Sequence, residues 1–145
     1  MTSALPAVLD ALIAAAAAAP ALEGVQVFDG PPVGDLGDQV VILGWSGDDP
    51  STEITDTTVT FDPTVSEQFA IPGQARSYSG DVEMAPRRTA VFALLDAVCG
   101  VADALAPVGV NCEAGVTVTS YTPRQIAQMG AEAEVRFTIT VTVYR

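Results

Sequence analysis

The strongest pattern in the sequence is a helical repeat of apolar residues within residues 86–106. The spacing places these residues on one face of an α-helix, and Pro86 suits the first turn. Pro107 and Gly109 stand where the pattern stops, as at many helix ends. We predict a long helix whose buried face consists of Val91, Leu94, Leu95, Val98, Ala102 and Leu105.

A second helix is predicted at the start of the chain. Thr2 or Ser3 can cap it, Pro6 is tolerated in its first turn, and Pro20 ends it. Six consecutive alanines at positions 14–19 favour helix and form a thin face that another backbone can approach closely. That face can pack on the protein's own sheet or contact another subunit, and the sequence leaves both open.

Several runs between the two helices predict strands. Residues 25–28 form a short candidate, and residues 39–45 hold four successive apolar residues, which predict a central strand covered on both faces. Residues 53–61 and 68–78 are predicted to pair as a hairpin through residues 62–67. We expect this hairpin to project from the body as an acidic arm.

Two further strands follow the long helix. Residues 114–121 and 135–143 alternate between apolar and polar, and the second has a threonine-rich outer face. Residues around 123–130 are a turn or a strand extension. This order of elements predicts one α+β domain over residues 1–145, with a mainly antiparallel (mixed) β-sheet and two helices packed on one face.

Composition restricts the function. The chain is 49% apolar, so it folds, and its formal net charge is -12. All six basic residues are arginine, and residues 1–85 hold thirteen of the eighteen acids with one arginine. A field of this sign repels phosphate backbones, which argues against a nucleic-acid reader.

The absence of histidine removes the commonest general base and metal ligand. Cys99 and Cys112 have no zinc spacing, and we expect free thiols in a reducing compartment. The glycines at 30, 34 and 37 lack the lysine of a phosphate-binding loop, and the acids at 48–56 lack the pattern of a calcium loop. We therefore expect no enzyme, no cofactor and no metal site.

The apolar stretch at residues 7–19 could be mistaken for a signal peptide. It has no basic segment before it and is shorter than the ~20 residues of a membrane span. The sequence therefore predicts a soluble, cytoplasmic protein without a membrane partner.

Arg87 and Arg88 are placed by the pattern in the first turn of the long helix, where the helix dipole disfavours positive charge. Two interpretations are open. The arginines contact an acidic surface of a neighbouring copy, or they pair locally with Asp81 or Glu83.

The layout of these elements resembles the tail-terminator family of long-tailed bacteriophages, over nearly the whole chain. The segments that carry the resemblance are the leading helix, Val25–Gly30, Val41–Trp45, Ser79-Gly80-Asp81 ahead of the helix with Arg87 and Arg88, and Arg136–Val141.

The resemblance implies a structural virion protein of the tail or neck. Such proteins form a homohexameric ring that caps the tail tube and joins it to the head connector, without enzyme activity or cofactor. The expected partners are other copies, a tail-tube protein and a head-tail connector protein, and assembly takes place in the host cytoplasm.

DNA must pass through such a ring without being bound, and acidic residues suit its channel. We expect the arginines to face protein instead. The candidates for the lumen are Asp48, Asp49, Glu53, Asp56, Asp62 and Glu67, and the candidates for the subunit interface are Arg87, Arg88, Arg136 and Arg145.

Two alternatives stay beside this interpretation. A head-completion or neck adaptor protein shares the size and mixture of elements. A small bacterial ligand- or peptide-binding module also fits one acidic α/β domain.

Overall fold

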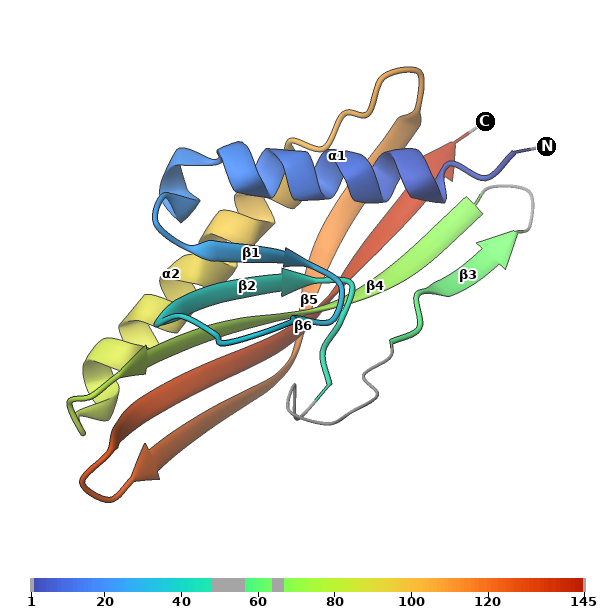
Figure 1. Ribbon diagram of the computed structural model, residues 1–145. Helices are drawn as coiled ribbons and strands as arrows, with labels where there is room; N and C mark the ends of the chain where they lie inside the picture. The colour runs from blue at the N-terminus through green and yellow to red at the C-terminus, as the bar shows by residue number, and fades with distance from the viewer. Residues whose placement is uncertain (1, 48–56, 64–66, 145) are drawn as a thin grey trace.

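The computed structural model describes residues 2–47, 57–63 and 67–144, which form two helices and a six-stranded mixed sheet (Figure 1). The α+β arrangement predicted from the sequence is confirmed. In chain order the elements are α1 (Leu5–Ala18), a 3-10 turn η1 (Pro20–Leu22), β1 (Gln26–Asp29), β2 (Gln39–Leu43), β3 (Thr60–Pro63), β4 (Glu67–Ser79), α2 (Met84–Asp103), β5 (Asn111–Ile126) and β6 (Gly130–Tyr144).

Strand β4 organises the sheet, whose order is β1-β2-β4-β6-β5. On one side β4 pairs with β6 along its whole length, from Glu67 opposite Val143 to Ser79 opposite Ala131. On its other side β3 pairs with the first part of β4 and β2 with the later part. All pairs are antiparallel except β1 with β2.

Both helices cover the same face of the sheet (Figure 1), as predicted. All six residues of the predicted α2 stripe are buried there, together with alternate residues of β6 from Ala133 to Val143. The helix begins at Met84, two residues before the predicted start, and ends at Asp103. Neither described helix is long and apolar enough to cross a bilayer.

The opposite face of β2 has a second, smaller core. Val40, Ile42 and Trp45 are buried there, with Phe28 and Leu36 packed against them. Leu36 lies in the loop between β1 and β2, so a loop covers this face while helices cover the other. The prediction that β2 is covered on both faces is confirmed.

The predicted hairpin is present as β3 and β4, but the prediction that it projects from the body as an arm is wrong. Phe69 and Ile71 of β4 are fully buried in the helix-side core, because β4 lies between β6 and the strands β2 and β3. At the edge, Phe61 of β3 stacks on Phe69 with ring centroids 5.7 Å apart. Residues 57–59 precede β3 without strand structure, and residues 53–56 lie outside the described chain.

Strands β5 and β6 are longer than predicted. The region around residue 123 proves to be a strand extension, and the turn is confined to residues 127–129. A register shift between Val118 and Ser120 bends β5 beside Phe137. Phe137 lies over Gly73, where a Cβ would approach the ring to within 2.3 Å, so the ring requires glycine beneath it.

The stripe of α2 and the inner face of β6 form one core, which predicts the cost of truncating it. Leu95→Ala or Phe137→Ala is expected to lower the free energy of unfolding by ~2–5 kcal/mol, because each leaves a cavity in a packed interior. Thermal and urea denaturation measure this loss. Unchanged midpoints in either variant would show that the assignment of inside and outside is wrong.

Candidate assembly surfaces

A chain of ion pairs crosses the face of the sheet that the helices leave open. Arg76 lies 2.9 Å from Glu132, and Arg124 bridges Glu132 at 2.9 Å and Glu134 at 2.7 Å. Arg136 completes the chain at 2.7 Å from Glu134. Strand register brings these residues together. Arg76 of β4 lies opposite Glu134 of β6, and Arg124 of β5 lies opposite Glu132 of β6.

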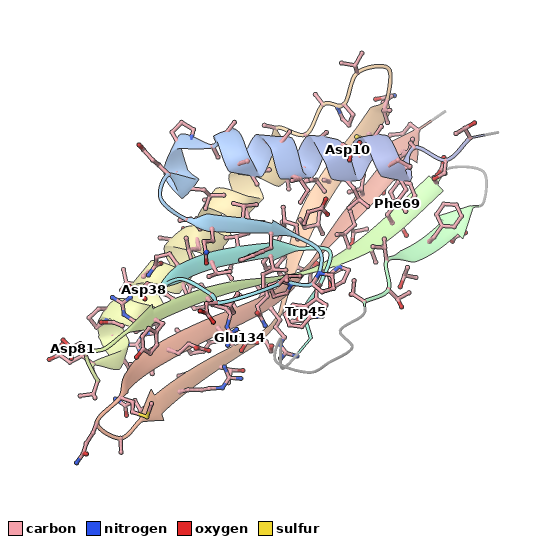
Figure 2. All side chains as sticks on the ribbon, in the orientation of Figure 1. Asp10, Asp38, Trp45, Phe69, Asp81 and Glu134 are labelled. Carbon is pink, nitrogen blue, oxygen red and sulfur yellow. The ribbon has the colours of Figure 1, made fainter. Side chains whose placement is uncertain are left out.

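Glu134 is the centre of this network, and Figure 2 shows it on the same side of the sheet as Trp45. The residue is only 1% exposed. Gln74 on β4 donates a third hydrogen bond to its carboxylate, at 2.6 Å. Burial alone raises the pKa of Glu134, but the hydrogen bonds and charges of Arg136 and Arg124 outweigh it and hold the pKa below its usual range.

The arginines predicted at a subunit interface differ in their surroundings. Arg87 donates to the Ser77 hydroxyl at 2.8 Å and to the Tyr78 carbonyl, which is neither of the two partners expected from the sequence. Arg136 belongs to the network around Glu134. Arg88 is exposed and, among the described arginines, is the one without a hydrogen bond or ion pair. Arg145 lies outside the described residues.

The acids predicted to line a lumen are placed only in part. Asp62 is exposed on β3, at the edge of the sheet. Four candidates fall outside the described residues, namely Asp48, Asp49, Glu53 and Asp56.

Glu67 is buried, so its prediction as a lumen residue is wrong. Its carboxylate accepts hydrogen bonds from the Ser3 hydroxyl at 2.7 Å and from the backbone N–H of Ala4 at 3.2 Å. These groups lie at the N-terminus of α1, where a negative charge is stabilised by the helix dipole. Glu67 therefore fastens α1 to the sheet, and its partners are 63 and 64 residues away in sequence.

A groove runs between α1 and α2 on the helix side of the molecule. It has a volume of about 570 Å³, and Asp96 is the only charged residue among the described residues that line it. Small side chains form the rest, because the alanines at the end of α1 face small residues of α2. The lining consists of Ala15, Ala19, Pro20, Ala21, Ala93, Asp96, Ala97, Gly100, Val101 and Ala104.

This groove bears on the alanine run of α1. Ala16 is buried against the protein's own core, whereas Ala14, Ala15, Ala17 and Ala18 are exposed. Ala19 is partly buried and also packs against this core, so the run packs on its own chain at two positions and leaves the other four alanines exposed.

Some of the exposed apolar side chains lie at the two ends of the sheet. Val82 precedes α2 and Met129 lies in the β5–β6 turn, at the end where Figure 2 labels Asp81. The Tyr78 hydroxyl holds the Met129 carbonyl at 2.7 Å, and the Gln125 side chain holds the Val82 carbonyl. Val108, in the turn between α2 and β5, is fully exposed at the other end.

Cys99 and Cys112 are free thiols, as expected, and both are half-buried. Burial raises the pKa of each, and Asp96 and Asp103 raise that of Cys99 further. Such thiols are poor nucleophiles. Within the described ranges, no three residues of the metal-binding types gather into a group.

Comparison with protein families finds no match to this sequence, and comparison with curated proteins finds none either.

The ion network predicts a dependence of stability on pH. Because the pKa of Glu134 is lowered by folding, its contribution is complete above the unfolded pKa of ~4.3 and is lost as the pH falls through the folded pKa. Glu134→Gln removes the charge while keeping the shape. At pH 7 it is expected to cost ~1.5–3 kcal/mol, the range for hydrogen bonds to a charged group.

Chemical denaturation between pH 7 and pH 3 measures this difference, with Glu23→Gln at an exposed site as the control. The gap between wild type and Glu134→Gln should narrow toward pH 3, while the control follows the wild type throughout. A constant gap, or none at pH 7, would contradict the role given to Glu134.

Proposed function

We propose that the protein is a ring-forming structural subunit, the tail terminator that caps a phage tail tube and joins it to the head connector. The observation that carries this proposal is the pair of unlike apolar surfaces on one small, acidic chain. The α1–α2 groove is a concave surface, and Val82 and Met129 are exposed at one end of the sheet. Unlike surfaces on one chain make head-to-tail contacts, which close into rings when the rotation permits.

The order of elements supports the same proposal. One helix, four strands, a second helix and a closing hairpin follow one another as in the layout on which the family resemblance rests. The role is structural, without enzyme activity or cofactor, and the proposed site of action is the tail or neck of the virion.

The charge of the chain supports the passage of DNA through the ring. Of the five described arginines, Arg76, Arg124 and Arg136 are paired with glutamates and Arg87 is bonded to its own chain. The surface is left strongly acidic, and an acidic channel does not hold a phosphate backbone. Asp62 and the acids of residues 48–56 remain the proposed lumen residues.

A small bacterial peptide-binding module is the second candidate, and the α1–α2 groove favours it. Apolar grooves between helices accept the apolar face of an amphipathic helix. The two candidates differ in self-association, because a module of this kind acts as a single copy.

Light scattering of the purified protein over a wide range of concentration separates the two. The terminator proposal predicts a species of six subunits, and the fraction of the protein in this species should rise with concentration. The same species should bind the ends of purified tail tubes. A monomer at every concentration that also fails to bind tube ends would overturn the proposal and favour the peptide-binding module.

A further inference from the structure

The α1–α2 groove is not filled by any of the residues that the structure describes. One wall of the groove is formed by α2 and the residue after it, through Ala93, Ala97, Gly100 and Ala104. None of these residues has a side chain that can reach across the groove. Ala15 and Ala19 leave the opposite wall equally thin. The described part of the chain therefore supplies no large side chain to cover this apolar surface, and another molecule can supply one.

Asp96 gives the groove its charge, and it forms no ion pair with any described residue. Its complement on the same chain is Arg88, the exposed arginine that is also unpaired there. Eight residues of helix separate the two, about 12 Å along the axis, so they do not meet within one copy. They can meet between two copies.

Arg88 also stands near the exposed apolar end of the molecule. Val82 lies just before α2, and the Tyr78 and Gln125 hydrogen bonds hold the Met129 turn beside it. Met129 is 64% exposed. Methionine is unbranched and flexible, so it fills irregular apolar gaps of the kind this groove presents.

We infer that the α1–α2 groove receives a second copy of this chain, whose Val82 and Met129 enter the groove while its Arg88 pairs with Asp96. The inference rests on the proposed ring and names the surfaces that join its subunits. Charge complementarity selects this occupant, because Arg88 and Asp96 are opposite in sign and neither forms an ion pair with the described residues of its own copy.

A charge exchange tests this contact. Arg88→Asp and Asp96→Arg each place like charges at the interface, so each should weaken self-association about tenfold or more. The double variant restores an opposite pair and should recover most of the wild-type association. Asp10→Arg, at an exposed site on α1 that does not line the groove (Figure 2), makes the same charge change and should have little effect.

A second pair of variants tests the groove without changing charge. Ala93→Leu fills it from an exposed position on α2 and should weaken association, whereas Ala14→Leu, exposed on α1 outside the lining, should not. Sedimentation velocity over a concentration series measures both pairs, with circular dichroism to confirm folding.

The outcomes separate this inference from the proposed function. If rings form as in the wild type with Ala93→Leu and with both single charge variants, the proposed contact is wrong, but the proposed ring is not contradicted. A double variant as weak as the single ones also overturns it. If the variants assemble normally but lose binding to tail tubes, the groove belongs to another protein and the inference is wrong. A wild-type monomer that still binds tube ends overturns the self-contact alone.

Discussion

The pairing of β4 with β6 is the interaction on which the rest of the structure depends. It runs through thirteen residue pairs and gives the sheet two unlike faces. On one face Phe69, Ile71 and Phe137 receive both helices. On the other, Gln74 of β4 and Arg136 of β6 reach the buried carboxylate of Glu134. A shift by one residue would exchange these faces and bury charge against the helices, so the two faces together fix the register.

The ion network also determines what the surface offers to partners. Three of the described arginines form ion pairs with Glu132 and Glu134, in a chain whose net charge is -12. What remains outside is acidic, with an apolar groove on the helix side and apolar ends. A large net charge disfavours non-specific association, and local apolar surfaces then select specific contacts. The proposed ring follows from this division between charge and contact surface.

The sequence was sufficient for elements whose partners are local in pattern. The stripe from Val91 to Leu105 and the alternation of β6 are periodic, so α2 and the inner face of the sheet could be predicted. The burial of Glu134 and Glu67 could not be predicted, because each occupies a position typical of a solvated acid. Each also bonds to a residue far away in sequence, Gln74 at a separation of 60 residues for Glu134 and Ser3 at a separation of 64 for Glu67. The signal in the sequence was that Glu132, Glu134 and Arg136 alternate along β6 and so share one face of it. Charged residues on one face of a strand can pair with charges on the neighbouring strands. The α1–α2 groove could not be predicted from the sequence either, because it exists only where α1 packs beside α2.

The central claim is that copies of this chain form the ring between tail tube and head. Single-particle imaging of a virion that carries the protein tests it most directly. The account predicts one ring of six copies at the head end of the tube, with Asp62 and residues 48–56 toward the channel and the α1–α2 groove filled by the adjacent copy. Virions without such a ring, or a ring whose channel is lined by Arg88, would contradict it.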